Sequence, residues 1–506
     1  MRTVTEISKS IQNSFCIAVA RLRRYTRATM AANAHFRYEE LANFIAGLIE
    51  NGTLLAGSRV PSLREISLQR RVSLSTALQA YRQLEDRGVL EARPQSGYYV
   101  APAAVTSLEA PAKSRPPAKA ATIALAGVVA RLLEHGADPK LVPLGCAVPS
   151  AKLLAAGRLD RFLARAARRK GTTYNTYTVP RGEVRLRREI ARRALRWGQA
   201  LAPDDIVITC GCTEALTIAL NVVAQPGDTI AVESPTYFGL LHTMEILGLK
   251  AFELPTDATH GIDLDALGDA CRNRSIKACL LSSGFSNPLG YTMADERKLA
   301  VLRLLGRYDV PLIEDDIYGD IHFDRTRPRP FMALDPNADV LYCSSFSKTV
   351  APGYRIGWLA STRHMQRILE KKSAFSLCSP ALPQVALADF LSSGGYDHHL
   401  RRLRREFNEN IQYMTRAIEK HFPPGTRVSR PAGGFVLWLE LASPVDTREL
   451  FDAALEKGIC FAPGDVFSAS KRYRNCLRLS CGHAWGPAIE NALRVLGTLA
   501  RKMSTT

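Results

Sequence analysis

No apolar run in the sequence is long enough to cross a membrane. A spanning helix needs about 20 consecutive apolar residues. The longest candidate, Ile123 to Leu133, is shorter and is interrupted by Gly127 and Arg131. The first 30 residues also lack the apolar core and small-residue cleavage site of a secretory signal. We therefore expect a cytoplasmic protein without a membrane partner.

Paired cysteines are missing as well. The 11 cysteines are scattered without a CxxC pair, and the nearest two are Cys210 and Cys212. Disulfide frameworks and zinc sites use paired spacings that this chain does not have. We expect reduced thiols, mostly buried, and no metal site.

Acidic residues are few for a chain of 506 residues. There are 48 Asp and Glu against 67 Lys and Arg, which gives a formal net charge of +19. The excess is densest in the first 121 residues, with 17 basic and 9 acidic side chains. Such a balance favours a polyanionic partner, such as a nucleic acid, near the front of the chain.

Residues 36–101 have the pattern of a small domain. Apolar residues recur at helical spacing over 38–50. Pro61 opens a second helix, and Ser73 gives the N-cap of a third. Two short apolar segments then flank the turn at 94–97. Three helices and a hairpin predict a winged helix.

The rest of the chain divides into segments of different character. Residues 1–35 precede the first well-patterned helix and are expected to be a disordered extension, with Met30 as an alternative start. Residues 102–121 are rich in Pro and Ala and predict a semi-rigid linker. Over 122–506, short apolar strands alternate with helices, which predicts an α/β domain with a mainly parallel sheet.

Four motifs in the first domain carry a family resemblance. PSLRE, VSxxT, AYxxL and SGYYV follow one another between residues 61 and 100. Their order and spacing resemble the GntR-type winged helix, which implies that the helix from Ser73 enters the DNA major groove. Leu74 stands where relatives often have a basic or polar residue, so base specificity stays open. The DNA-binding residues implied are Ser62, Arg64, Ser73, Ser75, Thr76 and Gln79.

These residue types suit contact with DNA. A helix N-terminus with serine hydroxyls binds a phosphate, and small polar side chains allow a helix to approach base edges. The alternative is a small helical cap with a solvated basic face. Four motifs in the right order make DNA binding the stronger interpretation.

Three motifs in the large domain point to a bound cofactor. They are SNPLG at 286–290, IEDDIYGD at 313–320 and SSFSK at 344–348, the last followed by APGYRIGW. This region resembles the fold-type I aminotransferases, which use pyridoxal 5′-phosphate (PLP). The resemblance implies that Lys348 holds PLP as a Schiff base, for which a lysine must be partly deprotonated.

The same resemblance assigns groups around the PLP ring. Asp315 would pair with the pyridinium nitrogen, and Asp316 is the alternative if the register is shifted by one. Asn287 and Tyr318 would bind the phenolic oxygen, and Tyr237 would stack on the ring. A protein contributes to PLP chemistry through such groups, which position the cofactor and tune its electronics.

Further residues are implied for the phosphate and the substrate. Tyr177 would reach the phosphate of a neighbouring subunit, which implies a homodimer. Arg478 would hold a substrate carboxylate with its two-pronged guanidinium. A surface ion pair at a strand end is the alternative for this arginine. The phosphate-binding residues implied are Gly211, Cys212, Thr213, Ser345, Ser347 and Arg355.

The two domains together resemble the MocR/GabR regulators, from residue 36 to about residue 500. The resemblance implies a transcription regulator that binds PLP and DNA, forms a homodimer, and senses an amino acid or amine by aldimine exchange at Lys348. One alternative is an active aminotransferase with a DNA-binding head. Another is a DNA-binding module with a purely dimerising second domain, which the presence of Lys348, Asp315 and Asn287 disfavours.

Overall fold

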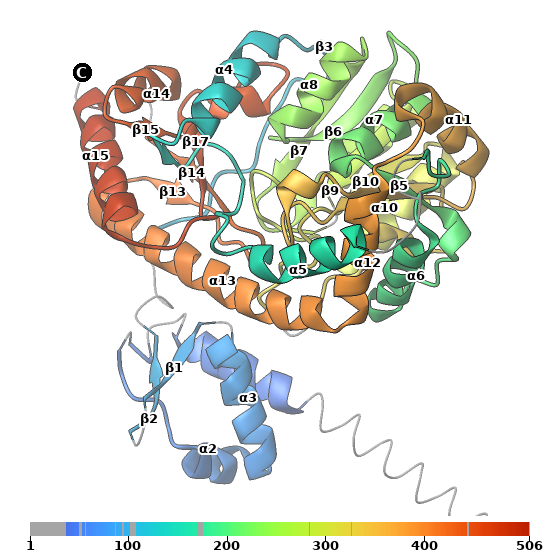
Figure 1. Cartoon of the computed structure of the whole chain (residues 1–506). Coiled ribbons are helices and arrows are strands. Elements are labelled where there is room, and N and C mark those ends of the chain that lie inside the picture. The colour runs from blue at the N-terminus through green and yellow to red at the C-terminus, as the bar shows by residue number, and fades with distance from the viewer. Residues whose placement is uncertain are drawn as a thin grey trace, which may run out of the picture. The chain divides into compact units, whose positions relative to one another are not determined.

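A computed structural model gives the structure of the chain (Figure 1). The chain divides into two units, Met1–Val105 and Thr106–Thr506, and each is described by itself. The N-terminal extension and Met30 lie outside the described residues. Cysteines within the described ranges are free thiols. None of the helices there combines the length and apolarity that a bilayer crossing requires. The structure describes residues 37–49, 53–55, 57–86, 88–93, 96–101, 108–168, 176–282, 284–324, 326–442 and 445–504.

Unit 1 is a winged helix, as predicted. A first helix over residues 37–49 is followed by α2 (Leu63–Arg70) and α3 (Leu74–Asp86). The strands β1 (Leu90–Arg93) and β2 (Gly97–Val100) then pair antiparallel as a hairpin. Tyr81 joins the parts, because its hydroxyl donates to the Pro61 carbonyl at 2.6 Å and its ring packs edge-on to Tyr98.

The largest sheet of unit 2 is mixed and has the strand order β3-β7-β6-β9-β10-β11-β12-β5, with β8 paired to β7. β7, β6, β9, β10 and β11 are parallel, and β5 runs in their direction because β12 is antiparallel to both β11 and β5. The predicted mainly parallel sheet is thus confirmed. The bounds are β3 Ala121–Thr122, β5 Ile206–Thr209, β6 Thr229–Ser234, β7 Lys250–Asp257, β8 Gly261–Ile262, β9 Ala278–Ser282, β10 Leu312–Asp315, β11 Val340–Ser345 and β12 Gly357–Ala360.

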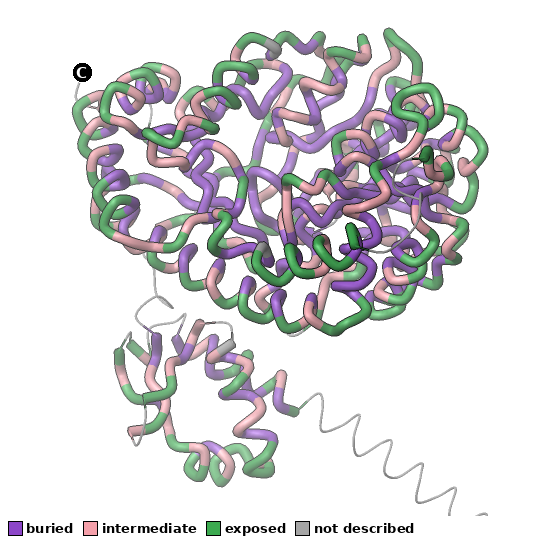
Figure 2. Tube along the Cα trace, in the orientation of Figure 1, coloured by how far each residue is buried: buried purple, intermediate pink, exposed green. Residues whose placement is uncertain are grey.

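Helices cover this sheet and bury its strands. In Figure 2 the strands are drawn almost wholly as buried, while the outward faces of the helices are exposed. Strands buried on both faces are expected of a parallel sheet in an α/β domain. The helices of this region are α4 Ala126–Ala137, α5 Ala156–Ala167, α6 Val184–Ala194, α7 Gly211–Val223, α8 Phe238–Ile246, α9 Leu264–Arg272, α10 Asp295–Arg307, α11 Met365–Ser376 and α12 Ala381–Ser392.

A smaller antiparallel sheet lies at one end of unit 2 beside the C-terminal helices (Figure 1). The long helix α13 connects the two parts of the unit, and both sheets share one hydrophobic core. The remaining elements are β4 Val142–Pro143, α13 Gly395–His421, β13 Arg427–Val428, β14 Val436–Glu440, α14 Thr447–Leu455, β15 Ile459–Cys460, β16 Ala462–Pro463, β17 Cys476–Ser480 and α15 Pro487–Ser504.

The segment expected to be a linker, 102–121, differs from that expectation in its second part. From Leu108 on it lies along unit 2. Ser114 donates its backbone N–H to the carbonyl of Thr256 at 3.0 Å, and β3 pairs with β7. An extended segment of this kind is held by backbone hydrogen bonds, so it has no apolar periodicity from which to predict its attachment.

Candidate functional site

A cavity of about 150 Å³ opens in unit 2 where several parallel strands end. Lys348 follows β11, Asp315 ends β10, Asn287 follows β9 and Tyr237 follows β6. Ligand sites in α/β sheets are found at the carboxyl ends of the strands. The predicted site residues that line the cavity are Lys348, Asp315, Tyr318, Asn287, Tyr237, Cys212, Thr213, Ser347, Arg355 and Arg478.

Lys348 has the properties of a reactive amine. Its Nζ donates to the Ala147 carbonyl at 2.7 Å. Burial, helped by the nearby Arg478 and Arg355 guanidiniums, lowers the pKa of Lys348 to about 8. At neutral pH an appreciable fraction of the amine is therefore unprotonated and able to attack a carbonyl carbon. Sequence reasoning missed Ala147, since a backbone carbonyl leaves no residue-type signal.

Two neighbouring carboxylates face opposite ways. Asp315 lines the cavity, and its nearest side-chain partner is the Cys212 thiol at 3.5 Å. Burial raises the pKa of Asp315 to about 6. Asp316 lies on the far side, where it is paired with Arg327 and accepts from the Tyr342 hydroxyl at 2.7 Å. Of the two carboxylates considered from the sequence, Asp315 is the one that faces the cavity.

Arg478, on β17, is fully buried beside the cavity. It donates to Asn287 Oδ1 at 3.2 Å and to the Gly145 carbonyl. Its Nε is buried and has no hydrogen-bond partner among the described residues. The surface ion pair considered as an alternative is therefore wrong. A buried cation with an unused donor is what an anionic ligand group requires.

Aromatic side chains enclose the middle of the cavity. Tyr237 and Tyr318 both line it, and burial raises the pKa of each phenol, so both stay neutral. The Tyr237 ring lies so close to Gly239 that a Cβ at Gly239 would collide with it. Phe238 also lines the cavity and was missed from the sequence, because an aromatic residue after Tyr237 is equally typical of a core.

Groups that suit an anion meet where α7 begins. Gly211 has a φ of +80°, and a Cβ there would collide with the Arg355 guanidinium. Arg355 donates to the Cys210 carbonyl at 3.1 Å, which holds it beside the helix N-terminus. Cys212, Thr213 and Ser347 line the cavity at this corner. Helix N-termini carry free N–H groups and a positive dipole end, which suit a phosphate.

Ser345 and Tyr177 do not line the cavity of this chain. Ser345 Oγ bonds to the Ile356 carbonyl at 2.9 Å and accepts the Ser347 N–H at 3.0 Å, so it shapes the loop that carries Ser347. Tyr177 is 84% exposed, and the neighbouring Thr178 hydroxyl donates to the Ser379 carbonyl at 3.3 Å. The tyrosine side chain is thus presented outward from an anchored backbone.

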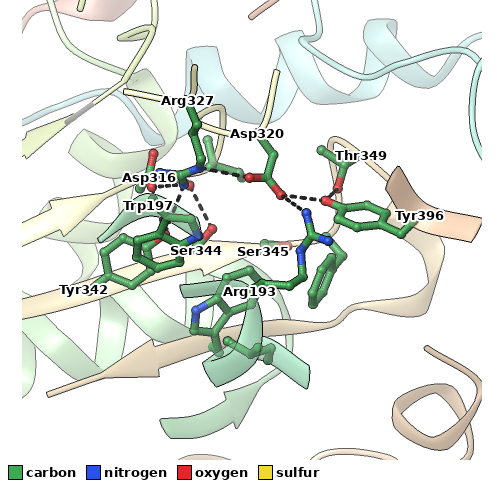
Figure 3. Close-up of a pocket in the computed structure, with 14 residues that line it drawn as sticks. Arg193, Trp197, Asp316, Asp320, Arg327, Tyr342, Ser344, Ser345, Thr349 and Tyr396 are labelled. Carbon is green, nitrogen blue, oxygen red and sulfur yellow. Dashed lines mark hydrogen bonds and ion pairs between the residues drawn. The ribbon is translucent and has the colours of Figure 1, made fainter. Parts of the chain in front are cut away.

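Charged side chains form a network behind the loop that carries Lys348 (Figure 3). Arg327 pairs with Asp316 and, at 2.9 Å, with Asp320. Arg193 approaches Asp320 at 3.5 Å. Burial of Asp320 opposes its ionisation, but Arg327 and Arg193 outweigh that effect and hold its pKa below the usual range. These charges are thus mutually compensated.

The network also fixes the residue after Lys348. The Tyr396 hydroxyl donates to Asp320 at 2.9 Å and bonds to the Thr349 hydroxyl at 3.0 Å (Figure 3). His399, like Tyr396 on α13, contacts the Thr349 carbonyl through Nε2 at 2.6 Å. The loop that carries Lys348 is therefore held from behind by side chains of another helix.

Replacing Arg327 with Met should destabilise the protein by about 3–5 kcal/mol, because the buried Asp316 would lose its counter-charge and the partly buried Asp320 would lose one of its neighbouring cations. Urea unfolding would measure it. The matched control is Arg329→Met, which breaks an exposed pair with Asp295 and should cost under about 1 kcal/mol. Equal effects of the two substitutions would contradict this role of the network.

The DNA-binding residues expected from the sequence lie at the starts of α2 and α3 in unit 1. Ser62 caps α2 reciprocally: its hydroxyl accepts the Glu65 N–H at 3.3 Å, and its own N–H donates to the Glu65 carboxylate at 2.6 Å. Ser73 caps α3 by accepting the Thr76 N–H at 3.1 Å. Two helix N-termini with serine hydroxyls are thus formed, as phosphate contacts require.

These residues differ in exposure. Ser62, Arg64, Ser73 and Ser75 are exposed, and Gln79 is half-buried. Thr76 is 9% exposed, and its hydroxyl bonds to Ser73 at 2.7 Å. Thr76 therefore shapes the start of α3 and is not placed for direct contact with DNA.

Comparison with protein families matches both units. Residues 152–494 match the family of class I and II aminotransferases, and residues 37–100 match the gntR family of bacterial regulatory proteins. The first match spans more than half of the chain, and the second coincides with the winged helix.

Relatives with both parts are similar along nearly the whole chain. The HTH-type transcriptional regulator YdcR of Escherichia coli is 39% identical over 468 residues, covering 92% of this chain and 99% of YdcR. The regulator YjiR of the same organism is 38% identical and covers 91% of this chain and 98% of YjiR. Among solved structures, the α-aminoadipate aminotransferase LysN of Thermus thermophilus has a TM-score of 0.69 and 26% identity, covering 74% of this chain and 95% of LysN.

The cavity fits PLP, the cofactor of class I and II aminotransferases. Lys348 supplies a buried amine of lowered pKa, and Asp315 supplies a carboxylate for a pyridinium nitrogen. The missing side chain at Gly211 lets the Arg355 guanidinium lie beside a helix N-terminus, and both groups suit a phosphate. The protein thus presents the groups through which an enzyme holds this cofactor.

The resemblance drawn from the sequence is confirmed in both units. Matches to the gntR family and to the aminotransferase family lie in one chain, in the order found in regulators that are similar over more than nine-tenths of its length. The chain therefore belongs to the family of HTH-type transcriptional regulators in which a gntR-family DNA-binding domain precedes a class I and II aminotransferase domain.

Proposed function

We propose that this regulator senses a free amino acid or amine in its PLP site and transmits the event to its DNA-binding unit. The observation that carries the proposal is the buried Arg478, whose Nε has no hydrogen-bond partner among the described residues and which lines the same cavity as Lys348. Lys348 accounts for an amine site and Arg478 for a carboxylate site. An amino acid carries both groups.

PLP, when bound, supplies a carbonyl carbon that reacts with amines and a ring that withdraws electrons. Lys348 would hold the cofactor through Nζ and, as a free amine, could carry a proton at that atom. Asp315 would hold a proton on the pyridine nitrogen, and Asn287 and Tyr318 would orient the phenolic oxygen. Arg478 orients the effector by its carboxylate.

Arg355 and Ser347 would hold the cofactor phosphate, together with Thr213 and the backbone around Gly211 and Cys212 at the start of α7. Tyr237 would cover one face of the ring. Ser345 contributes by shaping the loop of Ser347. These contacts would hold the cofactor independently of its bond to Lys348.

We propose that two chains form a homodimer. The support is Tyr177, which is exposed on an anchored segment and does not line its own cavity. A second copy would receive this side chain at its phosphate corner. Effector binding then shifts the populations of dimer states that present the two DNA-binding units differently.

In unit 1, we propose that Ser62 and Arg64 bind phosphates and that Ser73, Ser75 and Gln79 face the major groove. A regulator acts where the genome is, so we propose a cytoplasmic location.

The test of sensing is a mobility-shift titration of DNA from upstream of the protein's own coding sequence, with the PLP-loaded protein and with amino acids added one at a time. We expect specific binding whose midpoint changes with some of them. Binding that no amino acid or amine alters would refute sensing.

A second function is transamination. The observation that favours it is the completeness of the cavity, with Lys348 at a pKa of about 8 beside Asp315 and Arg478. LysN, of similar fold, is an aminotransferase. Conversion of an amino donor at an ordinary turnover of about 10 per second would establish an enzyme. A change in the cofactor absorbance without consumption of the donor would support the function of a regulator.

The pKa of Lys348 predicts how cofactor capture depends on pH. Because burial lowers this pKa to about 8, the amine is mostly protonated at pH 6.5 and mostly free at pH 9. The rate at which cofactor-free protein captures PLP should rise through pH 8 and then level off. Stopped-flow absorbance would measure it. A rate that keeps rising towards pH 10 would show an amine of ordinary pKa.

A further inference from the structure

The charged groups that line the cavity are few. Among the described lining residues they are Lys348, Asp315, Arg355 and Arg478. On the proposed function, three of these serve the cofactor. Lys348 would bind its carbonyl carbon, Asp315 would pair with its ring nitrogen and Arg355 would bind its phosphate. Arg478 remains, and it can compensate one carboxylate. A second carboxylate or an ammonium on the effector would meet no opposite charge on these residues.

Two aromatic rings lie close to the Arg478 guanidinium. The Phe238 and Phe467 rings lie 5.6 and 5.2 Å from the centre of its guanidinium. Leu216 on α7 and Phe238 on α8 line the cavity, and both are buried. A carboxylate seated on Arg478 therefore has hydrocarbon beside it, and a charged effector side chain there would lose its hydration without compensation.

Two apolar side chains that line the cavity are exposed to solvent. Leu133 on α4 is 51% exposed and Val148 is 39% exposed, although both line it. Their segments are in contact, because the Cys146 thiol, two residues before Val148, lies 3.9 Å from the Leu132 carbonyl on α4. A ligand side chain laid against them would remove apolar surface from water, which stabilises a complex roughly in proportion to the area covered.

We infer that the effector is an amino acid with a single carboxylate and an uncharged, apolar side chain, held by Arg478 at one end and by Leu133 and Val148 at the other. This inference rests on the proposed function and adds the class of ligand. Dicarboxylic amino acids, diamino acids and amines without a carboxylate are disfavoured by the same lining.

The first test is a panel of ligands on the full-length, PLP-loaded protein. L-leucine, L-phenylalanine, L-alanine, L-glutamate, L-lysine and butylamine are titrated by the change of the cofactor absorbance, and their effect on DNA binding is measured in parallel. We expect leucine or phenylalanine to bind at least about tenfold more tightly than alanine, since each buried methylene adds affinity. Glutamate, lysine and butylamine should bind more weakly than alanine.

The outcomes separate the two proposals. Tightest binding by glutamate, lysine or butylamine overturns the inference and leaves sensing intact. Absence of any response to all six compounds overturns the inference and counts against the proposed function as well.

A substitution tests the apolar end directly. Leu133→Arg places a cation at the cavity, so leucine affinity should fall about tenfold and glutamate affinity should rise. The matched control is Leu195→Arg, an equally drastic change at a side chain that is 64% exposed and outside the cavity lining. Unchanged leucine and glutamate affinities in Leu133→Arg, with normal cofactor absorbance, would remove Leu133 from the binding site and overturn the inference.

Discussion

Replacing Lys348 with Ala should abolish covalent cofactor binding and, with it, every response of DNA binding to amino acids. The amine is the one lysine nitrogen in the described lining of the cavity, and it is held towards the Ala147 carbonyl at 2.7 Å. Without it, PLP can be held only by non-covalent contacts, so the protein should lose its cofactor absorbance completely on desalting. Absorbance spectra of wild type and variant, before and after desalting, measure this.

The DNA-binding unit provides the internal reference for this variant. Because Lys348 and the caps of α2 and α3 belong to different units, DNA affinity without effector should stay within about twofold of wild type. Lys457→Ala, at an exposed lysine outside the cavity lining, should behave as wild type in both assays. A Lys348→Ala protein that keeps its absorbance band through desalting would contradict the assignment of Lys348.

Replacing Arg478 with Met should separate ligand binding from stability. The guanidinium is fully buried, and no ion pair to it occurs among the described residues. Loss of a buried partner for a carboxylate costs about 2–5 kcal/mol, which corresponds to a fall in amino acid affinity of roughly 30-fold to several thousand-fold. Titration of the cofactor absorbance with the best effector of the wild-type protein would show it.

The unliganded Arg478→Met protein should be at least as stable as wild type. An apolar side chain of similar length replaces a desolvated charge whose Nε has no partner among the described residues. Urea unfolding without effector measures this, and Arg472→Met, at an exposed arginine of the preceding loop, is the control. Effector affinity within twofold of wild type in Arg478→Met would mean that another group binds the carboxylate.

Residues whose chemistry dictates their type could be predicted from the sequence. Lys348 must be an amine, Asp315 a carboxylate and Arg478 a cation, so their motifs and the resemblance to aminotransferases were enough to bring them into one proposed site, and the structure places all three at one cavity. The same holds for the winged helix, whose caps at Ser62 and Ser73 require small hydroxyl side chains.

Features that depend on backbone or on burial could not be predicted. The carbonyls of Ala147 and Gly145 accept from Lys348 and Arg478, and any residue could supply them. Ser345 and Ser347 look equivalent in the sequence, yet only Ser347 lines the cavity, because the Ser345 hydroxyl is turned to the Ile356 carbonyl. Thr76 is turned inward for the same kind of reason: its place on α3 faces the core.

The coupling between the two units is tested most directly by measuring it from both ends. The affinity of the PLP-loaded protein for its best amino acid is determined with and without saturating operator DNA, and its affinity for that DNA with and without the saturating amino acid. Linkage requires the two ratios to be equal, and typical couplings give about 5- to 150-fold. We predict equal ratios in that range. Ratios of one in both directions, with both ligands bound, would show that the two units act independently and would contradict a sensor.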